Sequence, residues 1–120
     1  MSKVLLIEDD PTMLSLLGTL LEMEDFQVVM LENFGEALAV IQEEKPDVIL
    51  MDVNLKSYNG LEILTEMRQD SDLDIVKVIM SSGMDYQAEG LEKGANDFIQ
   101  KPYMPDDLID KVNLLTSEDK

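Results

Sequence analysis

Three continuous apolar runs narrow the fold of this chain more than any other part of its sequence. They lie at residues 4–7, 48–51 and 75–80, and only the last is interrupted, by Lys77. A run without alternating polar residues is typical of a strand that is covered on both faces. Such strands form parallel sheets, in which helices make the connections. The three runs therefore predict a parallel sheet between two layers of helices.

Helical patterns separate these strand-like runs. Two shorter apolar runs, at residues 26–30 and 98–99, complete a set of five predicted strands. Asp10 and Pro11 are typical of an N-cap and of the first turn of a helix. Apolar residues recur at helical spacing in five segments, which lie at residues 13–21, at 34–41, from about 60 onward, at 84–92 and at 108–115.

The strands and helices alternate five times, without a repeat, a low-complexity segment or an internal linker. This alternation predicts an α/β domain of the doubly wound, flavodoxin-like class. We expect a five-stranded parallel sheet in the order 2-1-3-4-5, with helices on both faces. Residues 1–120 are interpreted as a single domain, and residues 116–120 as a flexible C-terminal tail or the start of a linker.

The charge and the absent residue types exclude several classes of function. The chain has 26 acidic and 9 basic residues, and its formal charge of −17 argues against direct binding of nucleic acid. It has no cysteine and no histidine, which excludes a disulfide scaffold, a thiolate metal site and histidine catalysis. No apolar stretch approaches the roughly 20 residues of a membrane span, and the start lacks a secretory signal, so we expect a cytoplasmic protein.

Acidic residues follow two of the predicted strands. Glu8, Asp9 and Asp10 come after the first strand, and Asp52 follows the third. In the expected strand order these two strands are neighbours, so Glu8, Asp9 and Asp52 converge beyond their carboxyl ends. Two unit charges about 4 Å apart interact by about 4 kcal/mol at an effective dielectric near 20, so the cluster needs a compensating cation. Carboxylate oxygens favour Mg²⁺ or Mn²⁺.

Two further polar residues follow the remaining predicted strands. Ser82 lies after the fourth strand and Lys101 after the fifth. Three carboxylates, a divalent cation and one lysine have a formal charge sum of zero. Such a site suits phosphoryl transfer, because the metal and the lysine offset charge on the oxygens while Asp52 acts as the nucleophile. Ser82 would then donate a hydrogen bond to the phosphorylated product.

These separated motifs resemble the receiver domains of bacterial two-component response regulators, including the chemotaxis receivers, over nearly the whole chain. Residues 6–11 resemble the acidic pair of that family, which implies that Glu8 and Asp9 hold the metal. Asp52, followed eight residues later by Gly60, resembles the phospho-acceptor motif. Residues 101–102, Lys-Pro, resemble the family's lysine and its usually cis peptide bond.

The resemblance also assigns roles to residues that the charge argument leaves open. It implies that Asn54 lends its backbone carbonyl to the metal and that Gly83, with Ser82, contacts the phosphoryl group. It places Phe98 at the family's aromatic switch position, where the ring is expected to turn inward on phosphorylation. Residues Asn54 and Met84 lie two positions after the acceptor and the hydroxyl residue, where the family modulates the rate of phosphoryl hydrolysis.

By the same resemblance the chain is a signalling switch that assists its own phosphorylation and dephosphorylation. The implied phosphodonor is a histidine kinase or a histidine phosphotransfer protein, and the implied state is a monomer or a weak phosphorylation-dependent dimer.

Two departures from the family pattern stand out. Lys56 replaces the proline usual four residues after the acceptor, and the step from Ser82 to Lys101 is about three residues short, which predicts a shortened fourth helix.

Three other functions compete with this interpretation. Asp52 and Asn54 imitate the first ligands of a calcium loop, but Ser57 and Ile63 occupy the positions of its glycine and its bidentate glutamate. A mononucleotide binder of this fold needs a phosphate-binding loop after the first strand, where this chain has three acids. A receiver-like scaffold that works without phosphorylation remains the alternative, and it gives no reason for the intact acids, acceptor and lysine.

Overall fold

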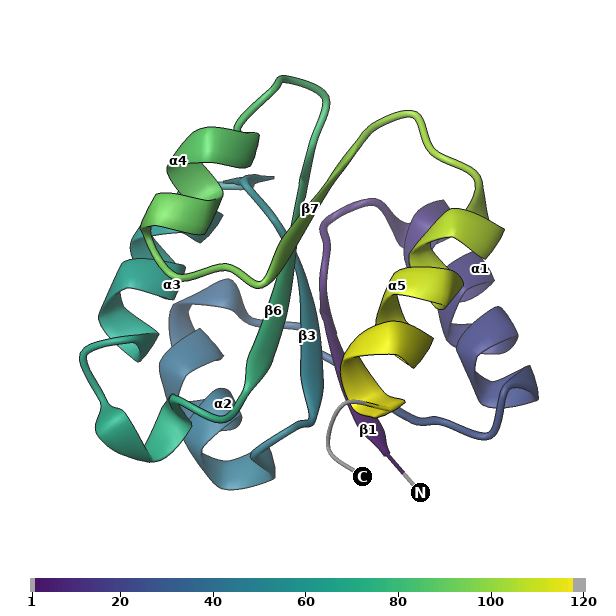
Figure 1. Ribbon diagram of the computed structural model, residues 1–120, viewed down its shortest axis with the longest axis horizontal. Helices are drawn as coiled ribbons and strands as arrows, with labels where there is room; N and C mark the ends of the chain where they lie inside the picture. The colour runs from purple at the N-terminus through teal and green to yellow at the C-terminus, as the bar shows by residue number, and fades with distance from the viewer. Residues whose placement is uncertain (1, 118–120) are drawn as a thin grey trace.

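The central feature of the structure is a five-stranded parallel sheet (Figure 1). A computed structural model describes residues 2–117. The sheet has the order β2-β1-β3-β6-β7, which is the expected 2-1-3-4-5 order once a separate two-stranded hairpin is numbered between β3 and β6. Its strands are β1 (Lys3–Ile7), β2 (Gln27–Met30), β3 (Val48–Asp52), β6 (Lys77–Ser82) and β7 (Asp97–Gln100).

Helices cover both faces of this sheet. In Figure 1, α2, α3 and α4 lie on one side, and α1 and α5 lie on the other. The doubly wound α/β fold predicted from the apolar runs is therefore confirmed. The helices are α1 (Pro11–Met23), α2 (Ala37–Glu44), α3 (Gly60–Met67), α4 (Gln87–Glu92) and α5 (Pro105–Ser117), with 3-10 turns η1 (Phe34–Glu36) and η2 (Ser71–Leu73).

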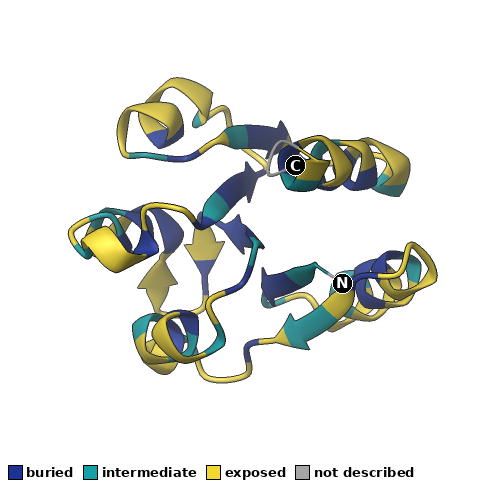
Figure 2. Cartoon of the chain, turned by 60° about the horizontal axis from the view of Figure 1, so that its bottom comes forward, coloured by how far each residue is buried: buried dark blue, intermediate teal, exposed yellow. Residues whose placement is uncertain are grey.

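Two hydrophobic cores lie on the two faces of the sheet. Along β1, Leu5 and Ile7 belong to the core under α2, α3 and α4, whereas Val4 and Leu6 belong to the core under α1 and α5. Every residue of β3 is buried. In Figure 2 the strands at the centre of the sheet are mostly dark blue, the colour of buried residues. This explains why the sequence of these strands is apolar throughout instead of alternating.

The pairing register brings the carboxyl ends of four strands to one edge. Ile7 pairs with Met51, so Glu8 and Asp52 follow directly at the ends of adjacent strands. Asp52 itself pairs with Ser81 on β6. On the far side of β6, Ser82 pairs with Gln100 on β7, so Lys101 follows at the same edge. Residues far apart in the sequence are thereby collected at one edge.

Several boundaries differ from those predicted. The fourth strand begins at Lys77 and not at Ile75, which lies 81% exposed in the turn before it. The side chain of Arg68 donates to the carbonyl oxygens of Leu73 and Val76 at 2.8 Å each, which holds that turn. Asp52 and Ser82 are the last residues of β3 and β6 and do not follow these strands, because the ladders extend through them.

Two further elements were not expected, and one helix is longer. A short antiparallel hairpin, β4 (Asn54–Leu55) and β5 (Tyr58–Asn59), connects β3 to α3. At the other end, α5 includes Thr116 and Ser117, which were assigned to the tail; residues 118–120 of that tail lie outside the described residues.

The fourth helix is short, in keeping with the short step from Ser82 to Lys101. It spans only the six residues of α4. After it the chain turns at Gly94, whose φ of +112° favours glycine, and the Arg68 side chain lies where a Cβ would project. Between residues 2 and 117, no helix is long and apolar enough to cross a membrane.

Candidate functional site

Three carboxylates meet at the carboxyl edge of β1 and β3. One oxygen from each of Glu8, Asp9 and Asp52 lies within 4.8 Å of the others. Glu8 is only 2% exposed and Asp52 only 6%. The predicted convergence is confirmed. The donor set is made of hard oxygen ligands, which fits Mg²⁺ or Mn²⁺ and does not fit a metal that prefers sulfur or imidazole.

Lys101 links two of these carboxylates. Its Nζ donates to Glu8 Oε1 at 2.7 Å and to Asp52 Oδ2 at 3.1 Å. Lys101 directly follows β7, and its peptide bond to Pro102 is cis, as the family resemblance implied. Burial alone would lower the pKa of Lys101, but the hydrogen bonds and charges of Glu8 and Asp52 outweigh it and raise that pKa above its ordinary value. The ammonium group therefore stays charged.

Glu8 is the most strongly held of the three acids. Its Oε2 accepts the backbone N–H groups of Asp9, at 2.9 Å, and of Asp10, at 3.2 Å. Burial raises the pKa of Glu8, and the nearby charge of Asp52 raises it further, against the opposing effect of Lys101. Lys101 alone therefore does not balance the negative charge of the carboxylates at this buried edge. A bound divalent cation would supply the missing positive charge.

Asp10 has a different role from its two neighbours. Its side chain accepts the backbone N–H groups of Thr12 and Met13 at 3.0 and 3.3 Å. It is the N-cap of α1, and Pro11 occupies the first turn, as predicted. The helix thus begins immediately after the acidic pair and fixes the direction in which the chain leaves the site.

The hairpin after Asp52 is held at both ends by backbone hydrogen bonds. The N–H of Val53 donates to Ser81 O at 2.8 Å, and the N–H of Gly60 donates to Val53 O at 2.7 Å. Asn54 lies between them, at the start of β4 and two residues after the predicted acceptor. Its side-chain amide lies 3.4 Å from Ser82 Oγ.

Ser82 lies at the same edge, fully buried. Its Oγ accepts the backbone N–H of Met84 at 3.1 Å as well as the Asn54 amide. Both bonds use the oxygen as acceptor, so the hydroxyl proton remains available for an acceptor in the site. A Cβ added at Gly83, the next residue, would meet nothing within 4 Å, so the space beside the Gly83 backbone is open.

Phe98 lies in the core and not on the surface. It is 8% exposed and belongs to the core under α2, α3 and α4. Its partner in the β6–β7 ladder is Met80, two residues before Ser82. The ring thus already has the inward position that was expected to follow phosphorylation.

Tyr103, two residues after Lys101, is a residue of this region that no sequence motif predicted. Its hydroxyl is buried and has no hydrogen-bond partner among residues 2–117. Burial, and then the charge of Glu8, raise the pKa of Tyr103 to about 12. A single aromatic residue in a loop has no periodicity, so only its place beside the Lys-Pro pair could have indicated a role.

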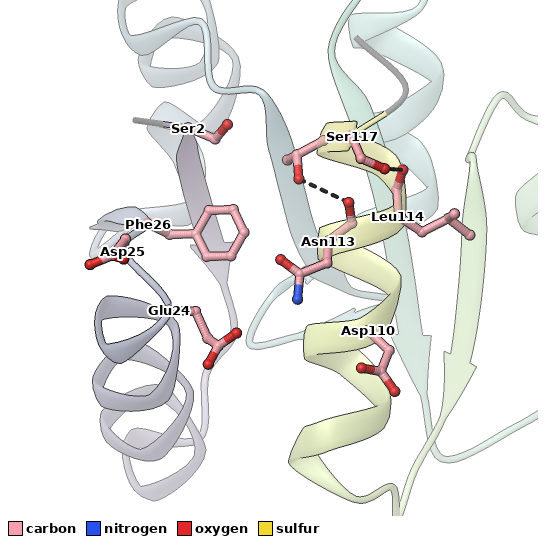
Figure 3. A pocket seen from close by; sticks show the side chains of 9 residues that line it. Ser2, Glu24, Asp25, Phe26, Asp110, Asn113, Leu114 and Ser117 are labelled. Carbon is pink, nitrogen blue, oxygen red and sulfur yellow. Dashed lines mark hydrogen bonds between the residues drawn. The ribbon is translucent and has the colours of Figure 1, made fainter. Parts of the chain in front are cut away.

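The groove drawn in Figure 3 lies at the opposite edge of the sheet. It has a volume of about 580 Å³ and lies between the loop before β2 and the last turns of α5. Phe26 faces Asn113 across it (Figure 3). Since Ser2 precedes β1 at this edge, the groove is separated from the carboxylates by the length of the strands.

The sequence matches a family described as the response regulator receiver domain over residues 4–113. This chain belongs to that family. The receiver domain is 31% identical over 116 residues to protein PilH of Pseudomonas aeruginosa, covering 94% of this chain and 96% of PilH. It is 34% identical over 114 residues to the transcriptional regulatory protein KdpE of Staphylococcus aureus, covering 95% of this chain but 49% of KdpE. The chain therefore spans about half the length of several curated relatives.

Solved structures of receiver domains superpose closely on this one. The receiver domain of the Francisella response regulator 1452 gives a TM-score of 0.92 at 29% identity and covers 100% of both chains. The chemotaxis protein CheY4 of Vibrio cholerae gives 0.86 at 26% identity, covering 96% of this chain and 98% of its own.

Family membership fixes the general role. Receiver domains are the signalling switches of two-component systems, and phosphorylation on an aspartate is a general property of the family. They bind Mg²⁺ at an acidic pocket and interact with histidine kinases or phosphotransfer proteins and with output domains. In this chain Glu8, Asp9 and Asp52 form an acidic cluster at the carboxyl edge of β1 and β3.

Proposed function

We propose that this receiver domain takes a phosphoryl group onto Asp52 from a histidine kinase or a histidine phosphotransfer protein. The observation that carries the proposal is the position of Lys101, whose Nζ lies within 3.1 Å of Asp52 and 2.7 Å of Glu8. A buried carboxylate held beside both a lysine and two further acids has the surroundings that phosphoryl transfer requires. A cytoplasmic site of action, as a monomer or a weak phosphorylation-dependent dimer, is part of this proposal.

The metal site of the proposal consists of oxygen donors. Glu8, Asp9 and Asp52 supply carboxylates, and Asn54 supplies its backbone carbonyl. When bound there, Mg²⁺ offsets negative charge on the carboxylates and on the phosphoryl oxygens. The raised pKa of Glu8 supports this, because burial and the charge of Asp52 disfavour the ionised Glu8 carboxylate, and a bound cation would stabilise it.

The transfer step uses Asp52 as a nucleophile. A carboxylate oxygen of Asp52 attacks phosphorus while the bond from phosphorus to the imidazole nitrogen of the donor breaks. The imidazole leaves with the bonding electron pair and is protonated, and its histidine belongs to the partner, because this chain has no histidine. Lys101 moves its contact from the Asp52 carboxylate to a phosphoryl oxygen, and Ser82 and the backbone at Gly83 contact the others.

Hydrolysis ends the signal. Water attacks phosphorus, the bond to Asp52 breaks, and the carboxylate is restored with release of inorganic phosphate. Asn54, with its side-chain amide at the edge of the site, helps to place this water. Met84, which is 64% exposed beside Ser82, limits its access.

The switch couples Ser82 to Phe98. A phosphoryl group near −2 in charge attracts the Ser82 proton, and movement of the hydroxyl toward it vacates space behind β6. This favours the buried position of Phe98 that the structure shows, over an outward one, and changes the surface formed by α4, β7 and α5. A change in population from 1:99 to 99:1 needs about 5.5 kcal/mol of differential interaction, to which a lysine and a hydroxyl contact contribute.

Intact mass spectrometry tests the proposal. The protein is incubated with a small-molecule phosphodonor and Mg²⁺, and we expect a mass gain of one phosphoryl group. The gain should vanish when the metal is chelated. A wild-type chain that never gains mass would support the alternative of a phosphorylation-independent binding scaffold.

A further inference from the structure

Tyr58 holds the hairpin that follows Asp52 against the loop before α2. Its ring lies edge-on to the ring of Phe34, with the two ring centroids 6.4 Å apart and the ring planes at 75°, which is a favourable arrangement for an aromatic pair. Its hydroxyl lies against Gly35, because a Cβ added at Gly35 would lie 2.7 Å from Tyr58 Oη. Phe34 and Gly35 belong to η1, so the ring joins the hairpin to a segment that precedes β3 in the sequence.

The hairpin needs this attachment because its own strands are short. β4 and β5 have two residues each, and a two-stranded hairpin has little stability on its own in water. Leu55, which pairs with Tyr58 across the hairpin, is buried in the core under α2, α3 and α4. Tyr58 is 46% exposed, whereas Phe34 packs against that core. Leu55 thus holds the hairpin from the inside, and the contact of Tyr58 with η1 holds it from the outside.

Asn54 is the site residue whose position depends on this hairpin. It pairs with Asn59, and the side chain of Asn59 caps α3 by accepting the N–H of Leu61 at 2.8 Å. The side-chain amide of Asn54 lies 3.4 Å from Ser82 Oγ. In the proposed function the backbone carbonyl of Asn54 is a ligand of the metal. A shift of the hairpin would therefore displace both groups from the site.

We propose that Tyr58 is a positioning residue for the metal site. By packing on Phe34 and Gly35 it fixes the hairpin, and with it the Asn54 carbonyl that binds Mg²⁺ in the proposed function, on which this inference rests. Residues that orient metal ligands influence metal affinity although they make no bond to the metal. Tyr58 acts in this way, through Asn54 alone.

The variants Tyr58→Ala and Tyr58→Phe separate the ring from its hydroxyl. Tyr58→Ala should weaken Mg²⁺ binding about tenfold, since residues that orient a metal ligand typically contribute at least this much. Tyr58→Phe is the matched control. It keeps the edge-on contact with Phe34 and should change the affinity less than about twofold. Isothermal titration of the protein with Mg²⁺ measures both variants.

The variant Gly35→Ala tests the same contact from the opposite side. Its methyl group would collide with Tyr58 Oη and displace the ring, so Mg²⁺ binding should weaken here as well. Combining Gly35→Ala with Tyr58→Phe removes the colliding oxygen, and the next nearest atoms, at 3.3 and 3.5 Å, leave room after a small shift. The double variant should therefore regain Mg²⁺ binding. This rescue separates positioning from a general loss of stability, and it does not depend on the folding of Tyr58→Ala.

NMR relaxation of the metal-free chain gives a readout that is independent of the metal. The order parameter of the Asn54 backbone N–H should fall in Tyr58→Ala and in Gly35→Ala, and it should keep its wild-type value in Tyr58→Phe.

Three results would overturn the inference. They are an Asn54 order parameter that is unchanged in Tyr58→Ala and Gly35→Ala, a Mg²⁺ affinity that is unchanged in both, and a double variant that binds Mg²⁺ no better than Gly35→Ala. A wild-type chain that binds no Mg²⁺ would instead contradict the proposed function.

Discussion

Gly60 begins α3 directly against the backbone of Asp52. A Cβ added at Gly60 would collide with the Asp52 carbonyl oxygen and lie 3.0 Å from its carbonyl carbon. The eight-residue step from the acceptor to this glycine is therefore a packing requirement: the hairpin returns the chain to the residue that carries the chemistry. Movement at either residue would displace the other.

The variant Gly60→Ala should lower the free energy of unfolding by about 1–3 kcal/mol, because backbone atoms must shift to admit the methyl group. Phosphorylation of Asp52 should slow as well. Gly90→Ala is the control, since its Cβ would meet atoms no closer than 3.7 Å and alanine favours the helix. Urea unfolding of both variants measures the difference, and a Gly60→Ala chain as stable as Gly90→Ala would contradict the close approach.

Glu8 should make the metal-free stability depend on pH. Its pKa is raised in the folded chain, so its contribution is fully present below the ordinary value of 4.5 and is lost as the pH rises through the folded value. Relative to Glu8→Gln, the wild type should therefore lose stability between pH 4.5 and neutrality when metal is chelated. Urea unfolding across this range measures the effect, and curves that stay parallel would show that Glu8 is not strained by its burial.

The acidic cluster was predictable because it depends only on strand order and on the residues that end each strand. Asp10 as a cap was likewise predictable from its place before Pro11. The hairpin at residues 54–59 was not, since strands of two residues have no periodicity. The late start of β6 also depends on a distant side chain, that of Arg68, which holds the carbonyls of the preceding turn.

Phosphoryl lifetime should respond in opposite directions to changes at Met84 and Asn54. The Met84→Ala variant should lose its phosphoryl group faster, because the methionine side chain no longer limits the access of water. The Asn54→Ala variant should lose its phosphoryl group more slowly. Each change should be under about tenfold, or about 1.4 kcal/mol of barrier. Met23→Ala, an exposed methionine at the far end of α1, is the control. Unchanged rates in both site variants would defeat the assignment.

The coupling of Ser82 to Phe98 should be visible by NMR with fluoroberyllate and Mg²⁺. In the wild type, signals of α4, β7 and α5 should shift together with those of the pocket. In Ser82→Ala and Phe98→Ala the distant shifts should shrink while the pocket shifts remain, because the mimic still binds. Equal distant shifts in all three proteins would show that the conformational switch does not depend on Ser82 or Phe98.

The identity of the phosphorylated residue is the central claim, and chemical trapping tests it most directly. An aspartyl phosphate is an acyl phosphate, which borohydride reduces to homoserine. After phosphorylation with Mg²⁺, reduction and proteolysis, peptide sequencing by mass spectrometry should place homoserine at position 52 and at no other aspartate. Homoserine at Asp9 or Asp10, or a mass gain that persists in Asp52→Asn, would contradict the account.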